Sequence, residues 1–334
     1  MKFNDIATKL NPLNPDVQAK ARNITIGNGS KNGLFLNIVV YVLLVAIGFV
    51  YVYPLLYMLM TSFKSLADLL DAAISWVPRQ ITLDNFREAF VVMRVSETIV
   101  DTFYVSLVPA LAQTASCALI GYGFARFKFP LKRLFLGLVL LTFIIPQHIL
   151  LVPTFVMFSN YGILGSIGTI LYPALLGQGM KSAIFILIFM QFFSLTPTSL
   201  DEAARVDGAG EMRVFIRIAL PLAIPALVVG FLFSFVWYWN DTYFLSLFMG
   251  GHATGTHSTV STLLMELNRF EASYLGFLQS LAGQWAAGQG MADQANEAIH
   301  MAATLITILP LLIIYLILQR QFVESIDKTG ITGE

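Results

Sequence analysis

Six apolar stretches, most of them long enough to cross a lipid bilayer, constrain the fold of this chain more than any other feature. A transmembrane helix needs about 20 consecutive, mainly apolar residues. We place spans at about residues 34–60, 99–124, 134–158, 181–195, 219–245 and 301–318. Only 12% of the 334 residues are charged, about half the share found in a soluble domain. The sequence therefore predicts an all-α membrane protein with six transmembrane helices.

The segments between the spans define the expected organisation of the chain. The polar tail 1–32 lacks the short apolar core of a cleavable signal peptide, so the first span is expected to remain in the protein. Residues 33–322 form one membrane domain, and residues 323–334 form a second polar tail. Connecting segments at 63–97 and 247–299 lie on one side of the membrane, and a polar loop at 196–218 lies on the other.

Local signals refine these spans. Pro146 and Pro153 lie inside the third span and free carbonyl groups that neighbouring helices must satisfy, so a bent helix packed inside the bundle is expected. The fourth span is short, and a turn or two from residues 175–180 would extend it. Thr82 is expected to cap a short helix, and residues 260–281 are expected to be helical.

The distribution of basic residues predicts the orientation. Segments 1–32, 125–133, 196–218 and 319–334 hold 5, 4, 3 and 2 Lys or Arg residues, fourteen in all. The alternate segments 63–97, 159–178 and 247–299 hold 4, 0 and 1, five in all. Basic residues favour the cytoplasmic side. Both termini and the 196–218 loop are therefore expected in the cytoplasm of a cell whose inner membrane holds the chain.

Charged residues are scarce inside the spans, and this bears on the function class. Asp101, Lys181 and Asp241 all lie near span ends. Carriers driven by protons or ions usually keep ionisable residues at mid-membrane, so a stand-alone secondary carrier is disfavoured. No cluster of catalytic residue types lies at a common depth, which also disfavours a membrane-embedded enzyme. Net charge is zero, and nothing indicates nucleic-acid binding.

No resident cofactor or metal site is expected on this chain. His148 and His300 lack Cys or carboxylate partners at ligand spacing. The only cysteine, Cys117, lies inside an apolar run and is expected to be a small core residue. No phosphate-binding loop of the type Gly-x-x-x-x-Gly-Lys-Ser/Thr occurs, so ATP would have to be bound by a separate subunit.

The polar loop 196–218 carries the most specific local signals. Ser199 and Glu202 have the spacing of a capping box, which predicts the start of a short helix. Gly208 is a ready helix stop in the left-handed region. A second helical run at 212–220 is expected to end at Pro221. A short, rigid helix outside the bilayer suits contact with a partner protein.

The same loop resembles a known family motif. Glu202-Ala203-Ala204, Asp207-Gly208-Ala209, Phe215, Ile218 and Leu220-Pro221 resemble the EAA loop of ABC importer membrane subunits. The resemblance implies the type I permease fold and makes the loop a coupling helix that docks into an ATPase subunit. The ATPase-contacting residues it implies are Glu202, Ala203, Ala204, Arg205, Asp207, Gly208 and Ala209.

Over roughly residues 30–330 the chain resembles permease subunits of bacterial carbohydrate importers of the maltose-system type. Pro146, Pro153 and the Leu309-Pro310 pair with Gln319-Arg320-Gln321-Phe322 carry this wider resemblance. It implies sugar import by alternating access, with a second permease subunit, an ATPase dimer that binds ATP and Mg²⁺, and an external solute-binding protein. The 247–299 segment is longer than usual, and the tail from Glu324 to Gly330 departs from the family's Gly-rich ending. A polyol, glycerol phosphate or another small polar solute remains an alternative cargo.

Three residues at the end of the fifth span are candidates for the substrate pathway. Trp237 and Trp239 offer aromatic faces that stack on sugar rings, and the Asn240 amide can bind hydroxyl groups. Trp residues at span ends also commonly anchor a helix at the membrane interface, and this is the favoured interpretation. In maltose-type importers the sugar site can lie mostly in the partner permease.

Overall fold

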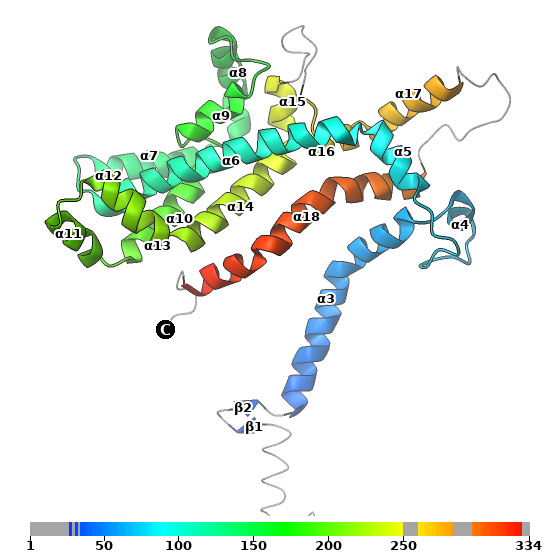
Figure 1. Ribbon diagram of the computed structural model, residues 1–334, viewed down its shortest axis with the longest axis horizontal. Coiled ribbons are helices and arrows are strands. Elements are labelled where there is room, and N and C mark those ends of the chain that lie inside the picture. The colour runs from blue at the N-terminus through cyan, green and yellow to red at the C-terminus, as the bar shows by residue number, and fades with distance from the viewer. Residues whose placement is uncertain (1–26, 29–30, 33, 250–259, 283–295, 329–334) are drawn as a thin grey trace, which may run out of the picture. The chain divides into compact units, whose positions relative to one another are not determined.

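A computed structural model describes residues 27–28, 31–32, 34–249, 260–282 and 296–328 (Figure 1). The predictions for most of the first tail, for parts of 247–299 and for the end of the second tail lie outside these residues. The chain forms two compact units, residues 1–82 and residues 83–334. We describe each unit by itself.

Unit 1 contains one long apolar helix. A two-residue antiparallel pair, β1 (Gly27–Asn28) and β2 (Lys31–Asn32), precedes α3 (Leu34–Ser62), and α4 (Leu66–Leu70) follows. The predicted first span is confirmed, because α3 is long and apolar enough to cross a membrane. Tyr53 stacks on Tyr57 and meets Trp76 edge-on, with ring centroids 6.5 and 5.1 Å apart. These aromatic contacts tie the end of α3 to the segment after it.

Unit 2 contains the remaining elements. Its α-helices are α5 (Asp84–Val92), α6 (Val95–Arg126), α7 (Lys132–Ile144), α8 (Leu151–Asn160), α9 (Gly168–Leu175), α10 (Ser182–Leu195), α11 (Ser199–Val206), α12 (Glu211–Val214), α13 (Leu220–Leu222), α14 (Ile224–Asn240), α15 (Tyr243–Met249), α16 (Leu263–Asn268), α17 (Phe270–Ala282) and α18 (Glu297–Lys328). A 3₁₀ turn, η1 (Gln147–Leu150), precedes α8, and a π-helical turn, η2 (Phe215–Ala219), joins α12 to α13.

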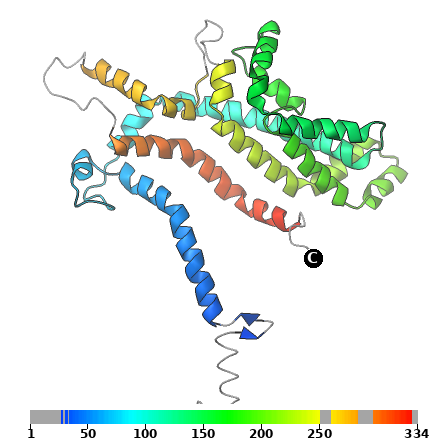
Figure 2. The same cartoon turned by 180° about the vertical axis from the view of Figure 1, so that it is seen from behind.

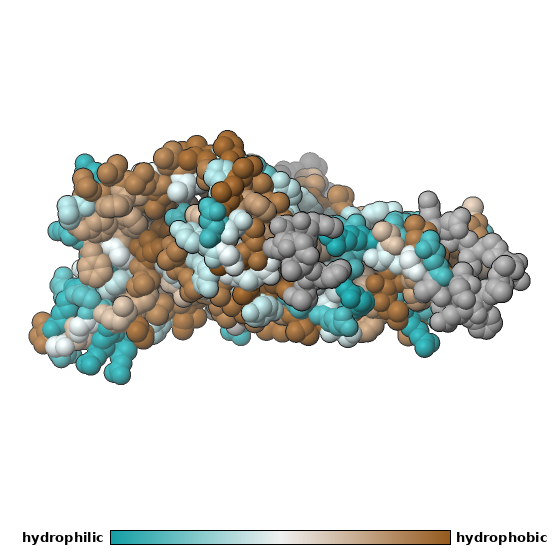
Figure 3. All heavy atoms as spheres, turned by 90° about the horizontal axis from the view of Figure 1, so that it is seen from above, coloured by the Kyte–Doolittle hydropathy of each residue, from teal (hydrophilic) through white to brown (hydrophobic). Residues whose placement is uncertain are grey.

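The long helix α6 is the centre of unit 2. It packs against α9, α10 and α14, and α18 packs against α14 and α5. Figures 1 and 2 show α11 at one end of this unit, which we call the α11 end, and α5 and α17 at the other, which we call the α17 end. Hydrophobic residues cover much of the surface seen in Figure 3. Such a surface is typical of helices that face lipid or other apolar partners.

Two buried threonine hydroxyls on α6 are satisfied within their own helix. Thr102 and Thr114 donate hydrogen bonds to the carbonyl oxygens of Thr98 and Ala110, four residues earlier, at 2.6 and 2.7 Å. The Thr102 hydroxyl also accepts a hydrogen bond from the Leu263 backbone N–H at 2.8 Å. Because a buried polar group is costly without a partner, these bonds allow α6 to carry polar residues through the core.

A close approach of two helices explains one glycine of α6. A Cβ atom built on Gly121 would lie 2.7 Å from Cβ of Phe189 and 2.8 Å from the backbone nitrogen of Met190, both on α10. Small residues of this kind let membrane helices pack backbone against backbone. Cys117, one turn earlier, is fully buried, which confirms it as a small core residue.

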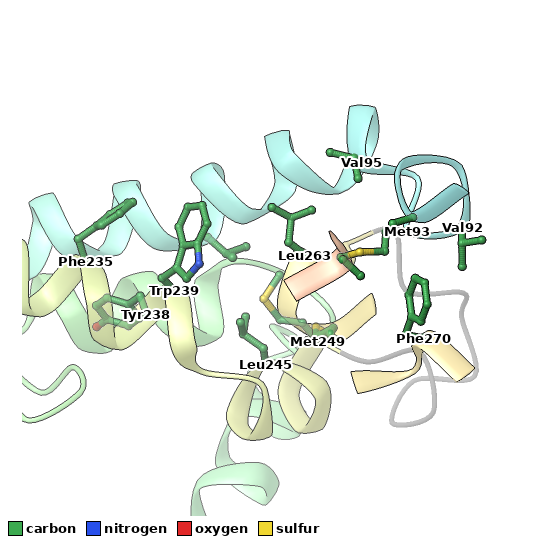
Figure 4. Close-up of a cluster of buried hydrophobic side chains, with 14 of the residues drawn as sticks. Val92, Met93, Val95, Phe235, Tyr238, Trp239, Leu245, Met249, Leu263 and Phe270 are labelled. Atoms are coloured by element: carbon green, nitrogen blue, oxygen red, sulfur yellow. The ribbon is translucent and has the colours of Figure 1, made fainter. Parts of the chain in front are cut away.

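A hydrophobic core lies between α6, α14 and the α17 end (Figure 4). Trp239 and Phe235 of α14 pack against Phe103 of α6, with ring centroids 5.4 and 6.3 Å away. Leu263 and Phe270, from α16 and α17, complete this core. The core holds the two central helices and the elements of the α17 end together.

The predicted number of spans is confirmed when broken helices are counted as single spans. Among the described residues, three unbroken helices, 34–62, 95–126 and 297–320, are long and apolar enough to cross a membrane. Three helix pairs pass the same test together but bend by 93°, 75° and 80°. These pairs are α7 with η1–α8, α10 with α11, and α12–α13 with α14.

The structure corrects the third span. We predicted one bent helix over 134–158 packed inside the bundle, but the helix breaks after Ile144, and Pro146 stands between the two pieces. Pro153 lies in the first turn of α8, where a proline costs no helical hydrogen bond. None of the α7 residues is fully buried, although Leu136 and Val139 pack against the core beside α10, so this half lies at the edge of the bundle rather than inside it.

The fourth and fifth spans are shorter than predicted. Residues 176–181 do not extend α10, since Gly177 and Lys181 adopt positive φ angles of 69° and 56°. The longer helix of the fifth span, α14, begins at Ile224 after the break at Ala223 and ends at Asn240 rather than at 245. The helical run predicted over 212–220, which precedes α14, does not end at Pro221 but continues through Leu222.

The segments of the α17 end are helical as predicted, with different boundaries. The helix α5 begins after Leu83, whose side chain provides no cap, and the expected capping role of Thr82 stays a prediction. The expected helix over 260–281 is two helices, α16 and α17, and the Thr262 hydroxyl caps the first of them by accepting from the Met265 N–H. The single residue Arg269, the C-cap of α16, lies between the two helices.

Candidate functional site

The loop 196–218, which we call the α11 loop, contains the predicted short helix with a different start. The cap residue of α11 is Thr198, whose φ and ψ of −73° and −19° are already helical, and no side chain caps the helix. Ser199 is therefore the first helical residue and does not close a capping box with Glu202. That part of the prediction is wrong, while the helix itself, Ser199–Val206, is confirmed.

The end of α11 follows the predicted glycine stop. Gly208 has a φ of +80°. The Ala209 N–H donates to the Ala204 carbonyl at 2.9 Å, and the Gly208 N–H donates to the Arg205 carbonyl at 3.0 Å. This pair of bonds is a Schellman motif, which satisfies the last carbonyls of the helix. Gly208 thereby sets the direction in which the chain leaves α11.

Replacing Gly208 by alanine is expected to destabilise the α11 loop by about 1 kcal/mol, because a residue with a Cβ resists the left-handed conformation. Space is not the obstacle, since a Cβ at Gly208 would meet nothing within 4 Å. Amide hydrogen exchange of residues 199–209 would measure the change. Gly210→Ala is the matched control: Gly210 has a φ of −71° and equally open space, so exchange there should stay unchanged or slow.

One face of α11 is available to a partner. Glu202, Ala203 and Val206 are exposed and share this face by their spacing of three and four residues. Val206 is 87% exposed, which is unusual for a branched apolar side chain. Asp207 and Gly208 are also exposed, and Ala204 and Ala209 are half-buried.

An exposed ion pair bridges the break after α11. Arg205 donates two hydrogen bonds to the carboxylate of Glu211, at 2.8 and 3.0 Å. This pair connects Arg205 on α11 with Glu211 on α12. The hydrogen bonds from Arg205 lower the pKa of Glu211 and raise that of Arg205. Both groups face water, so the pair contributes little to stability by itself.

A second ion pair in the α11 loop is buried. Asp201, in the first turn of α11, lies with one carboxylate oxygen 2.9 Å from Nε of Arg126, the last residue of α6. The two side chains are only 3% and 6% exposed. The Nε contact is ionic rather than an aligned hydrogen bond, whereas Nη2 of Arg126 donates to the Thr196 carbonyl at 3.0 Å. Sequence reasoning missed this pair.

A cavity of about 510 Å³ lies between the broken spans of unit 2. Residues from α7, η1, α8, α9, α10, α14 and α15 line it. Its polar lining residues are Thr142, Gln147, His148, Thr154, Thr169, Gln178, Lys181, Ser182, Tyr238 and Asp241. The mixture of hydroxyl, amide and charged groups suits a polar solute.

A buried hydrogen-bond network supports one wall of this cavity. The Tyr238 hydroxyl donates to Oε1 of Gln113 at 2.6 Å and accepts from the Met180 N–H at 3.3 Å. Nε2 of Gln113 donates to the Met180 carbonyl at 2.8 Å. Both backbone groups of Met180, in the break between α9 and α10, are thus satisfied by side chains of α6 and α14.

Comparison with known proteins identifies the family. Residues 118–328 match the model of a family described as the binding-protein-dependent transport system inner membrane component. That match spans α11 and most of unit 2. The chain belongs to this family.

Curated relatives of this transport-system membrane component are permease proteins. The sn-glycerol-3-phosphate transport system permease protein UgpE of Yersinia pestis is 30% identical over 233 residues, which are 68% of this chain and 71% of that protein. The diacetylchitobiose uptake system permease protein NgcG of Streptomyces coelicolor is 26% identical and covers 86% of each chain. The chain is accordingly a permease subunit of a binding-protein-dependent importer, and such a subunit is not itself an enzyme.

A solved structure has a fold similar to that of this chain. It is a bacterial ABC transporter involved in the import of the acidic polysaccharide alginate. The TM-score is 0.70 at 19% identity, over 86% of this chain and 96% of the other. The likeness supports the expected type I permease fold.

The residues predicted for the substrate pathway are Trp237, Trp239 and Asn240, and none of them is among the residues that line the cavity. Trp239 is 2% exposed and belongs to the core shown in Figure 4. Trp237 packs against Phe185 with ring centroids 5.2 Å apart. Asn240 is exposed, and its amide donates to the Val236 carbonyl of its own helix at 2.8 Å. From this turn of the chain, Tyr238 and Asp241 reach the cavity instead.

Proposed function

We propose that this permease subunit imports a carbohydrate and that its α11 loop is the coupling helix that docks into an ATPase subunit. The observation that carries the proposal is the exposed face of α11, Glu202, Ala203 and Val206, on a helix fixed at both ends. At its start, Asp201 is paired inside the protein, and at its end Gly208 sets the exit angle. A short helix held in this way transmits force better than a flexible connector.

We place the α11 end in the cytoplasm. The segments 125–133 and 196–218, which flank this end, hold four and three Lys or Arg residues. Basic residues next to spans favour the cytoplasmic side, where ATP is available. Both chain termini then lie on the cytoplasmic side as well.

The partners follow from this assignment. One permease subunit forms half of a pathway, so a second, homologous subunit completes it. A dimer of ATPase subunits binds ATP and Mg²⁺ and moves the coupling helices. An external solute-binding protein delivers cargo at the α17 end, and the pathway opens alternately to the two sides.

The cavity supports a carbohydrate as cargo. Carbohydrates present many hydroxyl groups, and amide, hydroxyl and charged side chains placed in a largely apolar pocket bind such solutes. Gln147, Gln178 and Tyr238 supply groups of this kind. Asn240, exposed and next in the chain to the cavity-lining residue Asp241, is our candidate for an additional sugar contact, while Trp237 and Trp239 hold this end of α14 in place.

Glycerol phosphate is the second candidate cargo. Lys181 lines the cavity and supplies a positive charge that favours a phosphate or carboxylate group. Uptake of a labelled neutral oligosaccharide, compared with uptake of labelled glycerol phosphate in the same cells, distinguishes the two cargoes.

The coupling assignment is tested by affinity purification of the tagged chain from mild detergent. Wild type is expected to retain an ATPase subunit and a second permease. Glu202→Lys and Val206→Arg are expected to lose the ATPase while retaining the second permease, because the first reverses a charge on the docking face of α11 and the second adds one. The loss should be about tenfold or more, since a desolvated charge at an interface costs several kcal/mol.

Val91→Arg is the matched control, because Val91 is an exposed valine on α5 at the α17 end. This variant is expected to retain the ATPase. A wild-type chain that purifies alone and transports solute into liposomes without ATP would contradict the proposed function.

A further inference from the structure

We propose that Arg126 and Asp201 are positioning residues that join α11 to α6 and α10, so that these helices move as one body when the ATPase moves α11. The inference rests on the proposed function, because it takes α11 to be the coupling helix. Arg126 and Asp201 lie outside the docking face of α11, and they would transmit the movement of that face to the helices in the membrane.

The geometry places one guanidinium group at the meeting point of three elements. Arg126 is the last residue of α6. Its Nε contacts Asp201 in the first turn of α11 at 2.9 Å, and its Nη2 contacts the carbonyl of Thr196, the C-cap residue of α10, at 3.0 Å. The planar fork of an arginine is suited to holding two such groups in a fixed relation.

Burial makes this contact rigid. Both side chains are more than nine-tenths buried, and the attraction between two charges is much stronger in a low dielectric than in water. Removing one partner leaves an uncompensated buried charge, which is far more costly than losing a surface ion pair. The α11 helix therefore has one strongly preferred position against the end of α6.

The helices themselves favour these charges at these positions. Asp201 lies in the first turn of α11, where the helix dipole stabilises an anion. Arg126 lies in the last turn of α6, where the dipole stabilises a cation. A buried ion pair is a poor device for stability alone, since apolar residues of similar size often do as well. Its advantage here is that it specifies one alignment of the two helix ends.

The second ion pair of the loop provides the contrast. Arg205 and Glu211 are 38% and 48% exposed and connect only the neighbouring helices α11 and α12. Water and salt screen such a pair, so it can open and close at little cost. Of the two pairs, only Arg126–Asp201 links α11 to the end of α6 and, through the Thr196 carbonyl, to the end of α10.

Aromatic packing beneath the pair should keep the charge-neutral variants folded. Tyr122 of α6 contacts Phe193 of α10 and Phe215 of η2, with ring centroids 5.3 and 4.9 Å apart. These contacts join the same part of the bundle without involving either charge. A variant without the ion pair is therefore expected to assemble, with an α11 that moves independently of α6.

The test uses the complete importer reconstituted in liposomes, with cargo transported and ATP hydrolysed measured in the same samples. In Asp201→Asn, the ATPase is expected to stay bound and to hydrolyse ATP, while cargo transported per ATP falls by about tenfold, within the range typical of coupling between sites. Glu211→Gln is the matched control, because it breaks the exposed pair by an equally small change. Its transport per ATP is expected to match wild type.

A double variant covers the case in which Asp201→Asn does not assemble. Arg126→Gln with Asp201→Asn removes both charges and leaves no unpaired ion, so it should assemble and show the same tenfold loss. Assembled variants that transport as much cargo per ATP as wild type would overturn the inference. If wild type itself retained no ATPase, the proposed function would fail. If wild type and its variants all retain the ATPase and transport equal amounts of cargo per ATP, only this inference fails.

Discussion

Replacing Gly121 by leucine is expected to separate α6 from α10 and to leave little folded protein in the membrane. The Cβ alone would lie 2.7 Å from Phe189 Cβ and 2.8 Å from a backbone nitrogen, so the helices must move apart before any further side-chain atom is accommodated. The cost should reach or exceed the top of the range of about 1–3 kcal/mol that overpacking usually causes. Backbone contacts, unlike side-chain contacts, cannot be relieved by a change of rotamer.

The buried thiol of Cys117 offers a direct measurement. It is the only cysteine of the chain and is fully buried, so a thiol-reactive dye labels it only after unfolding. The temperature at which labelling begins should fall sharply in Gly121→Leu. Gly123→Leu is the control on the same helix, since a Cβ there meets nothing within 4 Å, and its labelling temperature should stay near that of wild type. Equal labelling curves for the two variants would contradict the close packing of α6 and α10.

The second large effect is expected at the network of Gln113, Tyr238 and Met180. Gln113→Leu leaves the Met180 carbonyl and the Tyr238 hydroxyl without their buried partner. Each unsatisfied buried group costs about 1–3 kcal/mol, so the variant should lose roughly 2 kcal/mol or more. Tyr238→Phe should lose a similar amount, because it removes the partner of both Gln113 and the Met180 N–H.

A double-mutant cycle separates the network from simple loss of packing. If the three groups act together, the losses of Gln113→Leu and Tyr238→Phe should not add in the double variant. Tyr243→Phe is the matched control, because that tyrosine is 53% exposed and should change stability by less than about 0.5 kcal/mol. Fully additive losses, followed by labelling of Cys117, would contradict a coupled network.

The number and approximate places of the spans could be predicted because the bilayer imposes an apolar length on any helix that crosses it. The breaks within spans were harder. Pro146 signals a kink, but the angle of 93° depends on how η1 and α8 pack, which no local pattern records. The break at Ala223 lies in an apolar run and carried no signal that we recognised, although Pro225 stands in the first turn that follows.

The α11 loop shows the same division between local and distant effects. Gly208 could be predicted as the helix stop because few residues other than glycine adopt a left-handed conformation at low cost. The start was wrong by one residue, since Thr198 and Ser199 are both good cap residues and only the folded chain chooses between them. Asp201 could not be recognised as a buried partner, because its counterpart, Arg126, belongs to a different helix far away in the sequence.

The Arg126–Asp201 pair has a consequence for protein engineering. A coupling loop is an attractive module for chimeras, because exchanging it would redirect a permease toward a different ATPase. The loop of this chain is not self-contained, since the charge that balances Asp201 is supplied by the end of α6. A donor loop with an apolar residue at position 201 would leave Arg126 buried without a partner charge. A workable graft therefore has to take positions 126 and 201 from the same parent.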